Sequence, residues 1–186
     1  MSIKKKWLNT QNTVEEQIED KTSQIKKLSY IDTLTNCNNR RAYDEKIQDL
    51  LSLYERYNTS FSISMLDIDN FKKINDTFGH HIGDIVLQDL SKIIKKNIRK
   101  NDYLFRVGGE EFIIIFHNKK STNNIIASEK IVRKIDSDLF ALNESNVTIS
   151  MGHTTVSKDD TADSIYERVD KLLYKAKKNG KNKLCY

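Results

Sequence analysis

Residues 103–116 read YLFRVGGEEFIIIF, and this stretch decides the fold class. Two apolar runs, at 103–107 and 111–116, flank the glycine pair Gly108-Gly109. Adjacent glycines between apolar runs are typical of a β-hairpin, because tight hairpin turns require positive φ angles. The stretch therefore predicts two strands joined by a glycine turn, and the turn projects from a rigid, very apolar second strand.

Periodic apolar residues on both sides of this hairpin predict further helices and strands, because spacings of three and four indicate helices and alternation indicates strands. The expected helices cover residues 40–56, 71–77, 85–98, 125–139 and 163–178, and the expected additional strands cover 61–67, 146–156 and 184–186. Strands interleaved with helices predict a mixed α/β sandwich. A loop carrying Gly79 and Gly83 is expected before the third of these helices. All six glycines are expected at turns or element ends, which favours one compact domain without a flexible linker.

Residues 7–29 read as an additional helix with a heptad-like seam. The seam alternates spacings of four and three along Trp7, Gln11, Val14, Ile18, Lys21, Ile25 and Leu28. Such an a/d pattern is typical of a coiled coil, but Gln11 and Lys21 interrupt it. An amphipathic helix packed on its own domain fits this short pattern equally well, so both interpretations stay open.

The composition is ordinary for a soluble protein, with 38% apolar and 31% charged residues. The net charge of +5 comes without a dense basic block, so nucleic acid and anionic lipid are not favoured as partners. Cys37 and Cys185 give no disulfide framework, which favours a reduced, cytoplasmic protein. The longest apolar run, at 112–116, is far too short for a membrane segment, and the polar residues 9–12 leave no apolar signal core.

Two groups of carboxylates stand beside the predicted strands. Asp67-Ile68-Asp69 follows the strand core at 61–67, and Glu110-Glu111 lies at the hairpin. Residues two apart on a strand share a face, and Mg²⁺ commonly pairs one or two carboxylates with substrate phosphates. Taken alone, the aspartates are better explained as N-caps of the next helix, and the glutamates as solvated turn residues. A shared metal site requires the two strands to be neighbours, which the sequence does not establish.

An ordered series of short motifs gives these carboxylates a context. In chain order they are Asp32-x-Leu34-Thr35-x-x-x-Asn39-Arg40-Arg41, Asp67-Ile68-Asp69-x-Phe71-Lys72-x-x-Asn75-Asp76-x-x-Gly79-His80-x-x-Gly83-Asp84, Gly108-Gly109-Glu110-Glu111-Phe112, Ser150-x-Gly152 and Ala176-Lys177-x-x-Gly180-Lys181-Asn182. The series spans residues 32–182 and resembles the motifs of the GGDEF family of diguanylate cyclases. One short match can arise by chance, whereas the ordered series makes coincidence implausible.

This resemblance implies a fold and an activity. The expected fold is α/β, with a central mixed, mostly antiparallel sheet flanked by helices as in class III nucleotidyl cyclases. Residues 30–186 would form the GGDEF catalytic domain, and residues 1–29 an N-terminal signalling helix. Two such domains would form a homodimer that condenses two GTP molecules into cyclic di-GMP and two pyrophosphates. The implied cofactor is Mg²⁺, with Mn²⁺ as a possible substitute.

The resemblance also implies which residues act in catalysis. The expected metal ligands are Asp67, the Ile68 carbonyl and Glu110, and the expected catalytic residues are Glu110, Glu111 and Lys72. Glu110 would help to deprotonate the attacking hydroxyl, and Glu111 would assist at a second metal. Phosphoryl transfer depends on positioning and on neutralising negative charge, which fits such a set.

The implied substrate-binding residues are Asn70, Phe71, Lys72, Asn75, His80, Asp84, Lys177 and Lys181. The amides at the helix start and the three lysines would face the phosphates. Asn75 and Asp84 would read the guanine edge, because a carboxylate accepts from both N1–H and N2–H₂, and Asp84 favours GTP over ATP. His80 fits a loop-ordering role almost as well. The family often has arginine in place of Lys181, so the charge is kept but bidentate contact is lost.

Arg99 and Asp102 form an RxxD pattern that ends shortly before the hairpin. Such a pattern usually reflects an ion pair at a helix end. Its spacing from Gly108, however, matches the family's inhibitory product site, where arginine and aspartate bind the guanines of cyclic di-GMP. Lys130, on the following helix, lies where some members have a second arginine. The resemblance therefore implies product inhibition through Arg99, Asp102 and Lys130.

Two other functions compete with this interpretation. A receptor could bind GTP or cyclic di-GMP without turnover, but such family members usually lose the hairpin motif or the metal residues, and both are present here. A cyclase that makes a single cyclic nucleotide would share the fold. The GGEEF hairpin and the RxxD pattern favour the dinucleotide product.

Overall fold

The computed structural model describes residues 30–117, 121–139, 141–142 and 145–186. Its strands are β1 (Asn38–Asn39), β2 (Phe61–Ile68), β3 (Tyr103–Arg106), β4 (Glu111–His117), β5 (Ala141–Leu142), β6 (Ser145–Asn146), β7 (Ile149–Thr155) and β8 (Lys183–Cys185). Its helices are α2 (Arg40–Tyr57), α3 (Phe71–Phe78), α4 (His80–Asn97), α5 (Ser121–Asp138) and α6 (Ala162–Lys178). The helix predicted over residues 7–29 lies outside the described residues.

Within this described part of the chain, one sheet has six strands in the order β1-β3-β4-β2-β7-β8. β2 lies in the interior of the sheet and pairs antiparallel with β4 on one side and with β7 on the other. β3 pairs antiparallel with β4, as the hairpin motif predicts, whereas the edge strands β1 and β8 pair parallel with their neighbours. The sheet is therefore mixed and mostly antiparallel, which confirms the expected fold class.

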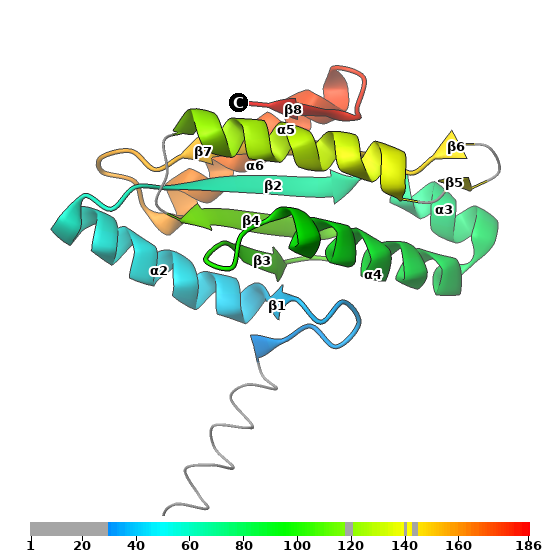
Figure 1. Ribbon diagram of the computed structural model, residues 1–186, viewed down its shortest axis with the longest axis horizontal. Helices are drawn as coiled ribbons and strands as arrows, with labels where there is room; N and C mark the ends of the chain where they lie inside the picture. The colour runs from blue at the N-terminus through cyan, green and yellow to red at the C-terminus, as the bar shows by residue number, and fades with distance from the viewer. Residues whose placement is uncertain (1–29, 118–120, 140, 143–144) are drawn as a thin grey trace, which may run out of the picture.

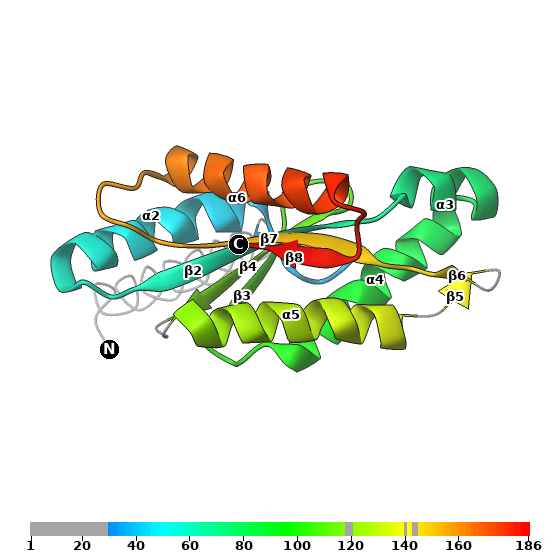
Figure 2. The same cartoon turned by 90° about the horizontal axis from the view of Figure 1, so that it is seen from above.

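Helices cover both faces of this sheet (Figure 1). Seen from above, α2 and α6 lie on one side and α4 and α5 on the other, while α3 lies beyond the end of β2 (Figure 2). Each layer has its own apolar core. Ile94 of α4 and Ile131 of α5 belong to one cluster, and Ile47 of α2 and Val169 of α6 belong to the other.

β2 contributes to both cores, because successive side chains of a strand point to opposite faces of the sheet. Ile63 and Met65 belong to the cluster under α2 and α6, and Leu66 and Ile68 belong to the cluster under α4 and α5. All eight residues of β2 are buried, as expected for a strand covered on both faces. Burial on both faces fixes the position of the carboxyl end of β2.

Two glycines lie inside regular elements, so the prediction that every glycine falls at a turn or element end is wrong. α4 begins at His80, and the expected loop around Gly83 is instead its first turn. Gly152 lies within β7. A Cβ at residue 152 would lie 2.5 Å from the Leu173 nitrogen and 3.0 Å from the Leu172 carbonyl carbon of α6. Glycine at this position therefore allows α6 to pack directly on the strand.

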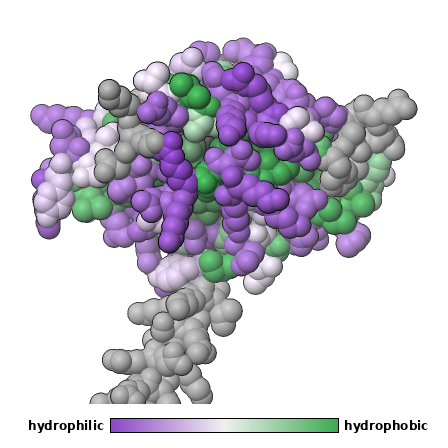
Figure 3. Space-filling view, in the orientation of Figure 1, coloured by the Kyte–Doolittle hydropathy of each residue, from purple (hydrophilic) through white to green (hydrophobic). Residues whose placement is uncertain are grey.

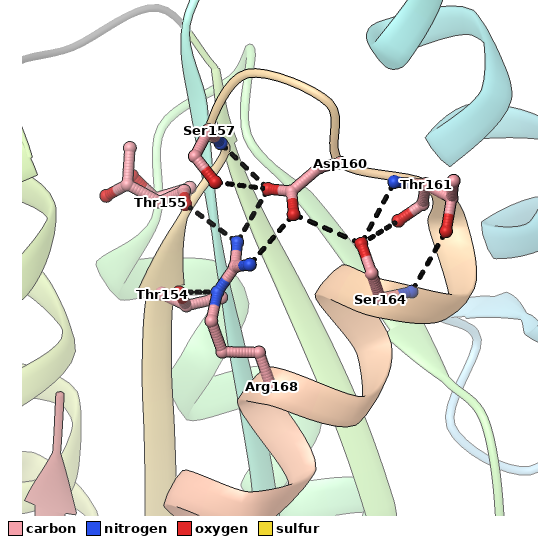
Figure 4. A network of polar contacts seen from close by, with 8 residues as sticks. Thr154, Thr155, Ser157, Asp160, Thr161, Ser164 and Arg168 are labelled. Atoms are coloured by element: carbon pink, nitrogen blue, oxygen red, sulfur yellow. Dashed lines mark hydrogen bonds and ion pairs between the residues drawn. The ribbon is translucent and has the colours of Figure 1, made fainter.

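A polar network fixes the connection from β7 to α6 (Figure 4). Arg168 donates to the two oxygens of Asp160 at 2.8 and 2.6 Å and to the Thr155 carbonyl at 3.1 Å. Hydrogen bonding from Arg168 lowers the pKa of Asp160 well below its usual range. Thr161 and Ser164 form a capping box at the start of α6. The network anchors the amino end of α6. The carboxyl end of the same helix reaches the end of β2.

The face of the molecule in Figure 3 is largely hydrophilic, with apolar side chains in small separate groups. Among the described helices, none combines the length and the apolar character needed to cross a lipid bilayer. Cys37 is buried and Cys185 is half-buried, and both are free thiols.

Candidate active site

Asp67 lies near the carboxyl end of β2, with a paired strand on each side. Its register partners are Glu111 of β4 and Ser150 of β7. The Asp67 side chain is largely buried, and Lys177 Nζ of α6 lies 2.8 Å from its Oδ2. Burial raises the pKa of Asp67, and the ammonium group of Lys177 opposes that shift. The last turn of α6 thus places a cation beside a buried carboxylate.

Glu110 brings a second carboxylate to the same place. It lies in the hairpin immediately before Glu111, which is the β4 partner of Asp67. Burial raises the pKa of Glu110, and the negative charge of Asp67 raises it further. The ionised form of Glu110 is therefore disfavoured unless positive charge is present nearby. The antiparallel pairing of β2 with β4 supplies the strand adjacency that a shared site requires.

These groups fit a hard divalent cation. Mg²⁺ and Mn²⁺ prefer oxygen ligands, and Mg²⁺ often binds one or two carboxylates together with substrate phosphates. Asp67, Glu110 and the Ile68 carbonyl offer only oxygen. The described residues contain no cluster of three or more histidine, cysteine, aspartate or glutamate side chains that could hold a metal by themselves. Such a site needs further oxygen ligands from the substrate or from water.

The tip of the hairpin is held by Arg106. Its Nε and Nη2 donate to the Gly109 carbonyl at 3.0 and 2.8 Å, and its Nη1 donates to Asp32 Oδ1 at 3.0 Å. Asp32 Oδ1 also accepts from the Thr35 amide and hydroxyl at 2.9 and 2.6 Å. These bonds tie the residue before Glu110 to the loop that precedes α2.

The predicted reason for the glycine pair in this hairpin is wrong, because neither Gly108 nor Gly109 has a positive φ. At Gly108 the close neighbour is the side chain of Glu111. A Cβ there would lie 3.3 Å from Glu111 Cδ and would overlap its carboxylate oxygen. The amides of Val107 and Gly108 also donate to the Glu111 carbonyl at 3.0 and 3.4 Å. The turn backbone thus lies close to Glu111, and a side chain at residue 108 would require the Glu111 carboxylate to move.

The start of α3 lies next to the same end of β2. α3 begins at Phe71, and Asn70 before it has a φ of 59° and makes no side-chain capping bond. The aspartates therefore do not cap this helix, and its first amides have no capping side chain, which is the arrangement of an anion site. Lys181 Nζ donates to Asn70 Oδ1. Lys72 is exposed on the first turn of α3.

Residues 29–183 match the protein family described as diguanylate cyclase, GGDEF domain. The chain belongs to the GGDEF family. Diguanylate cyclase DgcS of Shewanella oneidensis is 36% identical over 155 residues, which are 83% of this chain and 51% of the relative. Diguanylate cyclase A of Treponema denticola is 44% identical over 128 residues, which are 67% of this chain and 34% of the relative. The matched residues therefore span about half of the length of the first relative and about a third of the second.

A solved structure has the same fold. It contains the coiled coil and GGDEF domain of DgcB from Caulobacter crescentus in complex with c-di-GMP. Its TM-score is 0.88 at 27% sequence identity, with 100% of this chain and 99% of that chain covered. Diguanylate cyclases of this family are nucleotide cyclases that need a divalent metal. In this GGDEF domain, the carboxylates of Asp67 and Glu110, near the carboxyl end of β2, are suited to binding such a metal.

The residues expected to read guanine lie on two packed helices of the GGDEF domain. Asn75 belongs to α3, and Asp84 belongs to the exposed first turns of α4, as does His80. A Cβ at Gly83 would overlap the Asn75 carboxamide and would lie 3.2 Å from Phe71 Cζ. The glycine lets α4 approach α3, and Asn75 and Asp84 come to lie on neighbouring helices.

The RxxD residues do not form the ion pair that such a pattern usually indicates. Asp102 Oδ2 accepts from the backbone amide of Arg99 at 2.9 Å, and its Oδ1 accepts from the His117 amide at 3.2 Å. The hydrogen bond between these two residues therefore uses the Arg99 backbone amide and not its guanidinium. A cavity of about 280 Å³ borders Arg99, Asp102 and Tyr103. Lys130 is exposed on α5 and does not line this cavity.

Sequence reasoning missed three contacts of this site: Arg106 with Asp32, Lys177 with Asp67, and the hydrogen bonds of Asp69. Asp32 and Asp69 lie within recognised motifs, but a motif does not name a side chain's partner. The position of Arg106 two residues before Gly108 was a usable signal, since its planar fork of donors suits a turn carbonyl and a carboxylate together.

Proposed function

We propose that this GGDEF domain is a diguanylate cyclase, which condenses two GTP molecules into cyclic di-GMP and releases two pyrophosphates. The observation that carries the proposal is the convergence of Asp67, Glu110 and Lys177 beside the uncapped start of α3. Such a place combines a cation site with an anion site, as a metal-bound triphosphate requires. The relatives described as diguanylate cyclases support the same activity.

The proposed metal is Mg²⁺, with Mn²⁺ as a substitute of similar chemistry. Asp67, the Ile68 carbonyl and Glu110 would hold it, with Glu111 assisting next to them. The bound cation would supply positive charge to the triphosphate. Lys72, Lys177 and Lys181 would supply further positive charge, and the amides at Asn70 and Phe71 would donate to phosphate oxygens.

In the proposed reaction, the 3′-oxygen of one GTP forms a bond to the α-phosphorus of the other. The bond between that phosphorus and the pyrophosphate oxygen breaks, and pyrophosphate leaves with its electron pair. Glu110 accepts the hydroxyl proton, and its raised pKa makes it a better base than an ordinary carboxylate. Each chain binds one GTP, so two domains must meet as a homodimer, and a second identical step closes the ring.

Base selection follows from hydrogen-bond complementarity. Asn75 and Asp84 would bind the guanine edge, where Asp84 accepts from N1–H and N2–H₂. Adenine lacks this pair of donors, so an ATP molecule in the site would leave the carboxylate without partners. His80, at the start of α4, would support this end of the pocket.

Two further assignments complete the proposal. Residues 30–186 would form the catalytic domain, and residues 1–29 would form an N-terminal signalling helix, which the heptad-like seam supports. Arg99 and Asp102, beside their cavity, form an inhibitory product site, with Lys130 as a more distant contributor on α5. The DgcB structure in complex with c-di-GMP supports product binding in a related domain.

Incubating the purified chain with GTP and Mg²⁺, followed by chromatography of the nucleotides, tests the proposal. We expect cyclic di-GMP and pyrophosphate, with a rate per chain that rises with protein concentration. Glu110→Gln should abolish the product without unfolding the domain, because the amide is neither a base nor an anionic ligand. Glu129→Gln, on the exposed face of α5, is the matched control and should be fully active. A 3′,5′-cyclic mononucleotide, or GTP binding without turnover, would instead establish one of the two competing functions.

A further inference from the structure

Asp69 stands two residues after Asp67, yet its carboxylate has a different environment. Its side chain is buried, and three donors bind its two oxygens. Ser150 Oγ donates to Oδ1 at 2.6 Å, Thr148 Oγ1 donates to Oδ2 at 2.7 Å, and the Asn182 amide donates to Oδ2 at 3.0 Å. The carboxylate is thus satisfied by the protein itself, whereas Asp67 has Lys177 and a like-charged neighbour.

One of these donors belongs to the turn after α6. Gly180, Lys181 and Asn182 have φ angles of 101°, 61° and 46°, which places three consecutive residues in the left-handed region. Lysine rarely adopts this conformation, because its Cβ crowds the backbone, and such residues persist only where surrounding contacts hold them. The contacts here are the Asn182 amide bond to Asp69 and the Lys181 amide bond to the Ala176 carbonyl at 3.1 Å.

The turn reaches the start of α3 through the side chain of Lys181, which donates to Asn70 Oδ1. Asn70 directly follows Asp69 and is itself left-handed, with a φ of 59°. The Asp69 amide donates to the Thr148 carbonyl at 2.9 Å, so backbone and side chain both attach this residue to the segment before β7. Asp69 therefore joins the two segments that would surround the phosphates, the start of α3 and the turn at 180–182.

We infer that Asp69 is a positioning residue, which holds the turn at 180–182 so that Lys181 faces the phosphates at the start of α3, and that it is not a metal ligand. This inference rests on the proposed function, because it deepens the account of the same phosphate site. The two aspartates of the Asp67-Ile68-Asp69 motif then have separate roles. Asp67 binds the cation, whereas Asp69 positions Lys181, which binds the phosphates.

Asp69→Asn is the decisive variant, because the shape is kept but the negative charge that binds all three donors is lost. We expect the KM for GTP to rise about tenfold, because hydrogen bonds to a charged acceptor are stronger than those to a neutral amide by roughly 1 kcal/mol each. The kcat should stay within about threefold, and the Mg²⁺ concentration for half-maximal activity should stay within about twofold. Asp67→Asn should instead lose kcat and require more Mg²⁺. Asp170→Asn, an exposed change on α6, is the matched control.

A double-mutant cycle tests whether Asp69 acts through Lys181. Lys181→Ala should also raise KM, and adding Asp69→Asn to it should raise KM by less than about twofold more, since the same contact is already lost. Additive effects of the two changes would overturn the inference. A purely structural role would lower the melting temperature and leave KM unchanged, which would also overturn it.

Hydrogen exchange provides a readout that needs no activity. The amide of Asn182 should exchange about tenfold faster in Asp69→Asn, while the amides in the middle of α6 should keep their rates. Unchanged exchange at residues 180–182 would overturn the positioning role whether or not the parent turns over GTP. If the parent chain did not turn over GTP, only the proposed function would be refuted, and the positioning role would still be tested by hydrogen exchange. The two failures are therefore distinguishable.

Discussion

Replacing Arg106 with alanine tests whether this side chain holds the tip of the GGEEF hairpin. Its guanidinium joins the Gly109 carbonyl to the Asp32 carboxylate, and the side chains of Arg106 and Asp32 are only 15% and 22% exposed. Hydrogen bonds to charged groups contribute about 1.5–3 kcal/mol each, and partial exposure reduces their sum. We expect the free energy of unfolding to fall by about 2–3 kcal/mol, or roughly 4–12 °C in Tm.

Turnover should fall more than nucleotide binding in the same variant. Without Arg106 the Gly109 carbonyl is no longer held, and Glu110 follows it directly. A displacement of about 1 Å in a catalytic group can cost about 100-fold in rate. Arg106→Lys keeps the positive charge but lacks the planar fork that spans the carbonyl and the carboxylate, so it should retain more of the stability than of the turnover.

Urea unfolding measures the stability of these variants, and chromatography of the product measures turnover. Arg133→Ala is the matched control, because Arg133 pairs with Glu129 on the surface and is 75% exposed, so its loss should cost less than about 0.5 kcal/mol. Equal unfolding free energies and equal turnover for Arg106→Ala and Arg133→Ala would refute the role of Arg106 in holding the tip of the hairpin.

The pH dependence of the same pair has a defined sign. Burial alone would raise the pKa of Asp32, but hydrogen bonds from Thr35 and Arg106 lower the pKa below its ordinary value. A carboxylate with a lowered folded-state pKa stabilises the protein above its unfolded-state value. The difference between parent and Arg106→Ala should therefore persist at neutral pH and shrink as the pH falls below about 3.8.

Three further changes have expected outcomes of their own. Asp84→Ala should weaken GTP binding about ten- to hundredfold by calorimetry, because it removes a charged acceptor for guanine, and unchanged affinity would contradict that role. Burial lowers the pKa of His153 from its ordinary value of 6.5 to about 4. As the pH falls below 6.5, the imidazole is therefore protonated in the unfolded chain but not in the folded one. The parent should lose about 2 kcal/mol of stability between pH 7 and 5 relative to His153→Gln, and parallel pH profiles would rule this out. Gly152→Ala should cost about 1–3 kcal/mol in urea unfolding, since its Cβ would meet the backbone of α6, and a neutral effect would argue against that close packing.

The sequence by itself predicted most of the elements and the family. The apolar spacings are local signals, and they placed β2, β4 and α6 within a few residues of their observed bounds. The ordered motifs identified the GGDEF family because residue types at fixed spacings need no knowledge of contacts. The same local signals misplaced the start of α4, because Gly83 is disfavoured in an isolated helix but tolerated where α4 packs closely on α3.

Only the tertiary structure decided which distant side chains meet. Asp67 and Glu110 lie together because β2 and β4 pair antiparallel with Asp67 opposite Glu111, and periodicity does not specify pairing or register. Lys177 reaches Asp67 because α6 packs against β7 at Gly152. Asp69 looked like a second metal ligand or a helix cap, and its binding to Asn182 depends on a turn far along the chain. Such contacts arise from the packing of whole elements, which residue order alone does not determine.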